Sequence, residues 1–150
     1  MGRRGAARHA EAMSRRLERW RGRLVADRPE IVVCRGGHCG SRREHPGFDH
    51  GAQLERFRDE LRGAPVTVSI SKCLDECEHA NVVVVTPGGP AAGSPPVWVG
   101  SVLDDATTDA VIEWVRGTGG FGQPPGAVAA HRFVPTHGGR IRRTGSARTR

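Results

Sequence analysis

Apolar and polar positions along the middle of the chain follow a pattern that predicts the strands and helices of one small domain. Four stretches, either continuously apolar or alternating with period two, predict strands at Glu30–Val33, Val66–Ser71, Asn81–Thr86 and Val97–Val102. Helical spacing of apolar residues predicts a helix from about Ala52 to Leu61, and another that follows a capping Asp104 or Asp105. The order β-α-β-β-β-α is typical of an α/β fold with helices against a four-stranded sheet. The run NVVVVT is the most apolar and is expected to be the central strand.

The two ends of the chain follow different patterns. Met13, Leu17, Trp20 and Leu24 fall on one stripe of a helix predicted over residues 6–25, with arginines off the stripe. We expect this amphipathic helix to dock its stripe on the domain; the alternative is that it binds a partner or an acidic surface. Beyond the Gly- and Pro-rich stretch 117–126, apolar residues are too sparse to offset ordering entropy, and little stable structure is expected.

The net charge of +7 is distributed unevenly over three parts of the chain. Residues 1–29 hold nine arginines against three acids, a net +6, and residues 118–150 hold six arginines and no acid, also +6. Residues 30–117 hold eight basic residues against thirteen acids, a net −5. We therefore predict a basic amphipathic N-terminal extension over 1–29, a domain over 30–117, and a flexible Gly/Arg-rich tail over 118–150.

Apolar runs in this chain are short. None approaches the length of a membrane-spanning helix, and no apolar segment of the kind found in export signals follows the Arg-rich start. These features predict a protein with no membrane span and a cytoplasmic location. In that compartment thiols stay reduced, so that paired cysteines are more often metal ligands than disulfides.

The chain has four cysteines, which form two close pairs. Cys34 and Cys39 (C-x4-C) follow the first predicted strand, and Cys73 and Cys77 (C-x3-C) lie between the second and third. Four thiolates suit an iron–sulfur cluster or zinc better than magnesium or calcium. Zinc sites favour C-x2-C pairs, and the C-x-x-C motif of thiol–disulfide chemistry is missing. The spacing therefore favours a cluster, with zinc as the structural alternative.

Other polar residues lie beside the cysteines. His38 and His79 are within or next to the two loops, but four cysteines already complete a ligand set, so we interpret both histidines as surface loop residues. Asp75 and Glu76 lack partners for acid–base catalysis and are interpreted as a solvated face.

The cysteine motifs CRGGHC and KCLDEC, together with the flanking strands VSIS and NVVVV, resemble those of the thioredoxin-like 2Fe–2S ferredoxins. They also resemble the cluster domain of the two-iron subunit of NADH:quinone oxidoreductase, over roughly Glu30 to Gly117. The acids around the second pair depart from the small residues usual in the family. The resemblance implies a thioredoxin-like ferredoxin domain with about four strands and two helices. It also implies a 2Fe–2S cluster ligated by Cys34, Cys39, Cys73 and Cys77.

The same resemblance carries expectations about function. It implies a one-electron carrier, not an enzyme, that exchanges electrons with a redox protein such as a reductase or oxidoreductase. About 29 residues precede the first strand, too few for the helical domain of the respiratory subunit, so we expect a stand-alone carrier. Homodimer formation is an expectation from the family. The alternative is a structural module, with zinc or a cluster, that presents basic arms to nucleic acid or to an acidic protein. Few aromatic residues accompany the arginines, which makes nucleic acid the weaker partner.

Overall fold

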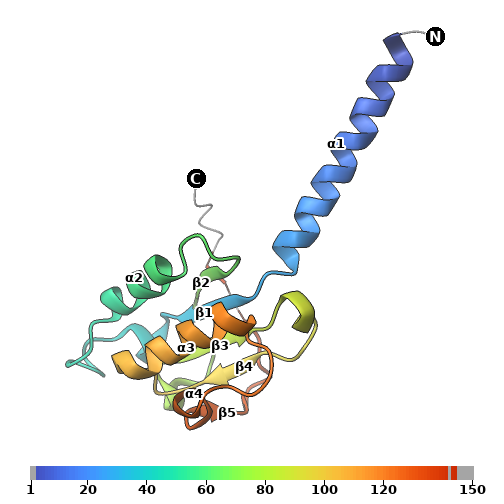
Figure 1. Ribbon diagram of the computed structural model, residues 1–150. Helices are drawn as coiled ribbons and strands as arrows, with labels where there is room; N and C mark the ends of the chain where they lie inside the picture. Colours follow the sequence, from blue (N-terminus) through green and yellow to red (C-terminus); the bar gives the residue numbers. More distant parts are fainter. Residues whose placement is uncertain (1–2, 142, 145–150) are drawn as a thin grey trace.

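A five-stranded mixed sheet forms the centre of the protein (Figure 1). The structure is a computed structural model that describes residues 3–141 and 143–144. The strands are β1 (Glu30–Cys34), β2 (Thr67–Ser71), β3 (Val83–Thr86), β4 (Val97–Val99) and β5 (Arg132–Phe133), in the spatial order β2-β1-β3-β4-β5. The α-helices are α1 (Arg3–Ala26), α2 (His50–Glu60), α3 (Asp105–Thr118) and α4 (Gly126–Ala129); the 3₁₀ turns are η1 (Gly37–Gly40), η2 (Cys77–His79) and η3 (Gly89–Ala91).

The pairing of β1 determines where the cysteine loops lie. Strand β1 runs parallel to β2 and antiparallel to β3, and Cys34 at its end stands opposite Ser71 at the end of β2. A parallel pair requires a crossover, which α2 supplies. Asp49 begins this helix by accepting a hydrogen bond from the Ala52 N–H at 2.9 Å. Because parallel strands end at the same edge, the segments after Cys34 and after Ser71 leave the sheet side by side.

Alternate residues of the central strands enter two separate cores. One face packs against α2 and α3, through residues such as Phe57 and Trp114. The opposite face carries Val32, Cys34 and Val84 and is covered by residues of the cysteine loops and of the C-terminal segment. The predicted α/β class is confirmed, and the run NVVVVT does supply the central strand, β3. The fifth strand and the short helix α4 were not predicted.

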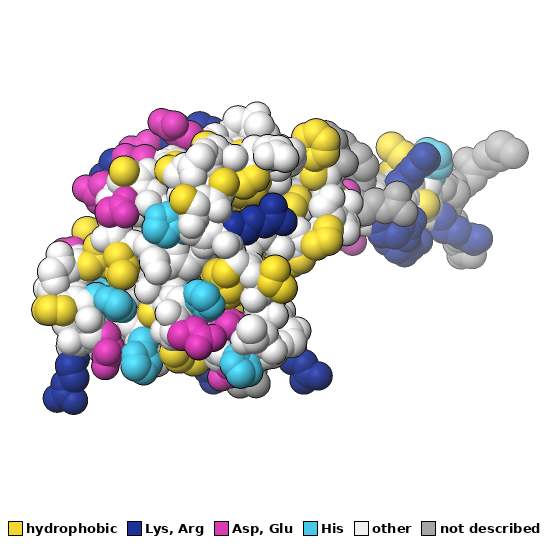
Figure 2. Space-filling model, turned by 90° about the horizontal axis from the view of Figure 1, so that it is seen from below, with side chains coloured by type: hydrophobic (Ala, Val, Ile, Leu, Met, Phe, Trp, Pro, Cys, Tyr) yellow, Lys and Arg dark blue, Asp and Glu magenta, His cyan; other side chains and the backbone are white. Residues whose placement is uncertain are grey.

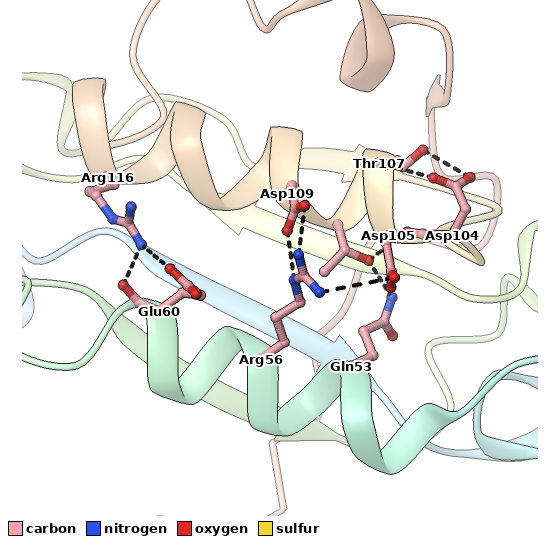
Figure 3. A network of polar contacts seen from close by, with 9 residues as sticks. Gln53, Arg56, Glu60, Asp104, Asp105, Thr107, Asp109 and Arg116 are labelled. Atoms are coloured by element: carbon pink, nitrogen blue, oxygen red, sulfur yellow. Dashed lines mark hydrogen bonds and ion pairs between the residues drawn. The ribbon is translucent and has the colours of Figure 1, made fainter.

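Polar contacts join α2 to α3 along one side of the domain (Figure 3). The Arg56 guanidinium donates to both carboxylate oxygens of Asp109, at 2.6 and 2.7 Å, and Arg116 pairs with Glu60 at 3.0 Å. Asp104 begins α3 by accepting from the Thr107 N–H at 2.6 Å, as its place in the sequence predicts. The two helices therefore form one layer against one face of the sheet, and apolar packing and bidentate ion pairing hold them together.

Helix α1 does not pack on the domain, and the prediction that it docks its stripe there is wrong. Figure 1 shows it projecting away from the sheet, and residues 7–19 are exposed along its length. Met13 and Leu17 keep about half of their surface in water, 51% and 50%. The side chains of Trp20 and Leu24 lie outside the described part. Apolar periodicity marks a face that can be buried, but it does not say whether the cover lies in the same chain.

The segment after α3 is more ordered than its composition suggested. Val128 of α4 is fully buried, β5 adds to the edge of the sheet, and Ile141 packs against the second core. The prediction of little stable structure is therefore wrong for residues 118–141, 143 and 144; residues 145–150 lie outside the described part. In the part of the chain that the structure describes, no helix is long and apolar enough to cross a membrane.

Candidate metal centre

The two cysteine loops meet at the edge of the sheet where β1 and β2 end. The Arg35 N–H donates to the Ser71 carbonyl at 3.1 Å, which carries the parallel pairing one residue past Cys34. Directly afterwards Gly36 touches the second loop, because a Cβ built on Gly36 would lie 2.0 Å from the Cys73 backbone nitrogen. Only glycine allows two backbones to approach this closely. The glycines of CRGGHC therefore bring the first loop against the second.

The sulfur atoms lie at this contact. Cys73 Sγ and Cys77 Sγ are 3.4 Å apart, and the Cys34 thiol donates across the loops to the Lys72 carbonyl at 3.7 Å. A Cβ on Gly37, which has a φ of +56°, would lie 3.3 Å from Cys77 Sγ and 3.5 Å from Cys73 Sγ. Cys39 Sγ accepts from the Val82 N–H at 3.3 Å. The structure thus brings together all four cysteines that the sequence indicated.

The two pairs differ in burial and in acidity. Cys34 and Cys39 are buried, with 1% and 2% of their surface exposed, whereas Cys73 and Cys77 are half-buried. Hydrogen bonding to Cys39 lowers the pKa of Cys34 to about 6, and the same interaction, with burial, raises the pKa of Cys39. For Cys73, a hydrogen bond from the Asp75 N–H acts to lower the pKa. Burial and the neighbouring thiols of Cys77 and Cys34 outweigh this hydrogen bond, so the pKa of Cys73 is raised above its usual value. Neighbouring thiols therefore shift the pKa values of Cys34, Cys39 and Cys73.

The donor set fits a thiolate-bound metal centre. With metal–sulfur bonds of about 2.3 Å and tetrahedral angles, two thiolates on one metal ion lie about 3.8 Å apart. The 3.4 Å separation of the Cys73 and Cys77 sulfurs is close to this value. One pair of thiols on each of two adjoining loops also matches a 2Fe–2S cluster, in which each iron takes two thiolates. The residues present fit that group.

Arg35 fixes the first loop from the inside. Its guanidinium donates to the carbonyls of Cys34 at 3.0 Å and Cys39 at 3.5 Å. It also donates to the carbonyl of His50 and to Oε1 of Gln53, at 3.0 and 2.9 Å. Gln53, which is buried, continues into the core by donating to the Val102 carbonyl and to Thr108 at 3.0 Å. One cation therefore ties the backbone at both cysteines of the first pair to α2.

Glu76 ties the second loop to the C-terminal segment, and its interpretation as a solvated residue is wrong. The carboxylate is 2% exposed and accepts hydrogen bonds from the backbone N–H groups of Thr136 at 2.6 Å and His137 at 3.0 Å. Burial acts to raise the pKa of Glu76, but these donors outweigh it and leave the pKa below its usual value. The C-terminal segment therefore holds the second loop at the residue before Cys77.

The two histidines lie at the rim of the centre. The side chain of His38 is exposed and stands 3.4 Å from the Glu44 carboxylate, which agrees with its interpretation as a surface loop residue. His79 is partly covered because its ring stacks on Phe133, with 3.9 Å between centroids and an angle of 14° between planes. His79 is thus a packing residue between η2 and β5. Sequence reasoning missed this contact and the role of Glu76, since both depend on residues more than fifty positions away.

Comparison with known proteins gives one kind of match. No family model matches the chain, and no curated protein matches it. Two solved structures are similar, and both are cysteine-to-serine variants of the thioredoxin-like [2Fe–2S] ferredoxin from Aquifex aeolicus. The first is 19% identical with a TM-score of 0.48, covering 71% of this chain and 99% of that chain. The second is 20% identical with a TM-score of 0.44, covering 67% and 95%.

Proposed function

We propose that the protein is a one-electron carrier that holds a 2Fe–2S cluster through Cys34, Cys39, Cys73 and Cys77. The observation that supports this proposal is the contact between the two cysteine loops: the Cys34 thiol reaches the Lys72 carbonyl of the second loop, and the Cys73 and Cys77 sulfurs lie 3.4 Å apart beside Gly37 of the first. A structural zinc ion can also be bound by four cysteine sulfurs, but a cluster with two irons uses them as two pairs. The wide spacing within each pair favours the cluster.

The chain's own residues would give the two pairs different tasks. Cys34 and Cys39 are covered by the second core and shielded from water, so they would anchor the group. Cys73 and Cys77 are half-buried and face the surface, so a redox protein would approach on their side. Gly37 would allow this approach, because it carries no side chain beside the two sulfurs. The bound cluster would supply the capacity to take up and release a single electron.

The first test is a visible spectrum of protein purified without oxygen, with iron, sulfide and zinc measured on the same sample. We expect charge-transfer bands that bleach with dithionite, and about two irons and two sulfides per chain. Cys34→Ser and Cys73→Ser should each reduce the iron content, whereas His38→Ala, a change at the exposed rim, should leave it unaltered. A colourless protein with one zinc per chain would overturn the proposal and make the domain a structural module.

A further inference from the structure

The apolar positions of α1 follow a heptad repeat. Separations alternate between four and three residues along Ala6, Ala10, Met13, Leu17, Trp20 and Leu24. This spacing is the signature of a helix that packs against another helix along a narrow seam. An amphipathic helix that lies on a membrane has a wide apolar face instead. The pattern therefore indicates a helical partner.

The seam is not covered within the described part of the chain. Helix α1 has 24 residues, so at 1.5 Å per residue it is about 36 Å long. It stands clear of the domain in Figures 1 and 2, and the seam residues Met13 and Leu17 are about half exposed. In proteins most of the stability of a helix comes from the packing of its apolar side and not from helix propensity alone. A partner would supply that packing.

The residues that flank the seam show which partner is excluded and which is favoured. The heptad register places Arg16 and Arg23 on one flank and Arg21 on the other. Flanking residues of two paired helices face each other and decide partner choice. A second copy of α1 would set arginine against arginine, and the helix as a whole holds eight arginines against two glutamates. The favoured partner is a helix with acidic flanks.

The attachment point of α1 keeps this surface away from the cysteines. The Asp27 carbonyl, directly after the helix, accepts a hydrogen bond from the Gly89 N–H at 2.6 Å, at the start of η3. Strand β1 then runs from Glu30 toward Cys34, so the helix and the metal centre lie at opposite ends of β1. A protein held by α1 would leave the cysteine edge accessible.

We propose that α1 is one half of a heteromeric coiled coil, and that the other half is an acidic amphipathic helix of a partner protein. The seam residues Met13 and Leu17 pack into that helix, and the arginines on the flanks pair with its carboxylates. Nucleic acid would satisfy the arginines but offers no apolar partner for the seam. The proposal concerns a surface separate from the cysteines and does not depend on the cluster.

The test uses the full chain and two synthetic helical peptides of the same length with leucine seams, one with glutamate and one with lysine on its flanks. Calorimetry and circular dichroism should show that the acidic peptide binds and that the basic peptide does not. Leu17→Asp should weaken binding about tenfold or more, because an apolar contact is lost. Arg16→Glu should weaken binding about fivefold, because an ion pair with a glutamate of the peptide is lost and replaced by repulsion between two carboxylates. Arg15→Glu, the same charge change on the outer side, should stay within about twofold.

Several results would overturn the proposal. These are failure of the acidic peptide to bind at low salt, equal effects of Arg15→Glu and Arg16→Glu, or binding that survives Leu17→Asp. Tighter binding to random duplex DNA or to phosphatidylserine vesicles, lost in the Arg16→Glu variant, would assign the helix to those surfaces instead. Self-association through α1 in sedimentation would assign it to a second copy. The iron content of each variant, measured in parallel, should be unchanged, which separates this result from that of the metal centre.

Discussion

The two cysteine loops make an instructive comparison, because each is held by one ionised side chain of opposite sign. Arg35 holds the first loop by donating to the carbonyls at Cys34 and Cys39, and it is anchored in α2, which directly follows that loop. Glu76 holds the second loop by accepting from the N–H groups of Thr136 and His137, about sixty residues away. The first loop depends on nearby sequence and the second on the C-terminal segment.

The two pairs also differ in burial. Arg35 ties the backbone of the first loop to α2, and Cys34 and Cys39 themselves are closed off from solvent in the core on the opposite face of the sheet. The second loop is tied to the segment that follows β5, and Cys73 and Cys77 remain half-buried. The electron carrier that we propose would need both properties, because a buried side would retain the bound group and an accessible side would exchange the electron. The loops should therefore respond differently to loss of their anchors.

Arg35→Met gives the largest expected effect. The substitution keeps the alkyl part of the side chain but removes the donor for three carbonyls and Gln53, so we expect a loss of about 3 kcal/mol in the free energy of unfolding. Urea denaturation followed by fluorescence of the buried Trp98 and Trp114 measures it. Arg43→Met, at an exposed position of the same segment, should stay within about 0.5 kcal/mol. Equal effects of the two changes would show that Arg35 does not anchor the loop.

Glu76→Gln should have a smaller and more local effect. The amide keeps one acceptor oxygen but loses the charge, so the hydrogen bonds from Thr136 and His137 weaken and we expect a loss of about 1.5 kcal/mol. Hydrogen exchange should become faster at the amides of Thr136 and His137 while the first loop keeps its protection. Glu78→Gln, in an exposed side chain of the same loop, is the matched control and should change neither. Unaltered exchange in the Glu76 variant would contradict the comparison.

The elements that sequence alone predicted are those set by local pattern. Strand β1 and helix α2 lie within two residues of their expected bounds, because apolar spacing is visible in a short window of sequence. The meeting of the cysteine pairs was only partly predictable from the sequence. Each pair follows a strand, but the two strands end at the same edge because they pair in parallel, and the sequence pattern does not show that pairing.

The parts that sequence could not predict depend on distant partners. Glu76 looks like a solvated acid until the N–H groups near Thr136 are in place, and the segment 118–144 looks unstructured until Ile141 finds the second core. The prediction that α1 docks on the domain was wrong for the opposite reason. The helix does carry an apolar stripe, but no described part of the chain packs against that stripe. Local composition gives the tendency of a segment, and long-range contacts decide the outcome.

Gly37→Ala tests the contact between the loops. Alanine at a φ of +56° is strained, and we expect a loss of about 1 kcal/mol. The new methyl group would also lie 3.3 Å from Cys77 Sγ, so metal bound at the cysteines should transfer to a chelator faster. Gly63 also has a positive φ, +79°, but a Cβ there would meet no atom within 4 Å. Gly63→Ala therefore introduces a similar backbone strain without a contact to sulfur. If the two variants released metal at the same rate, Gly37 would serve the backbone turn alone.

Arg143→Gln should have the smallest effect and shows which part of the C-terminal segment holds the second loop. Arg143 pairs with Glu30 at the start of β1, and the pair is partly exposed, so we expect a loss below about 1 kcal/mol at neutral pH. Burial acts to raise the pKa of Glu30, but hydrogen bonds from Arg143 and Ser69 outweigh it and lower the pKa below 4.5. The contribution is therefore fully present above pH 4.5 and is lost as the pH falls through the lower folded-state value.

Unfolding of the wild type and of Arg143→Gln at a series of pH values should show a difference that narrows in this acid range. Arg58→Gln, which removes an exposed pair with Glu55 inside α2, serves as the control and should show a smaller difference at every pH. Exchange at the Thr136 amide should stay slow in the Arg143 variant, because Glu76 and not the end of the segment anchors that residue. Fast exchange at the Thr136 amide would mean that the second loop is held through the whole C-terminal segment. It would contradict the view that a single side chain, Glu76, anchors the second loop as Arg35 anchors the first.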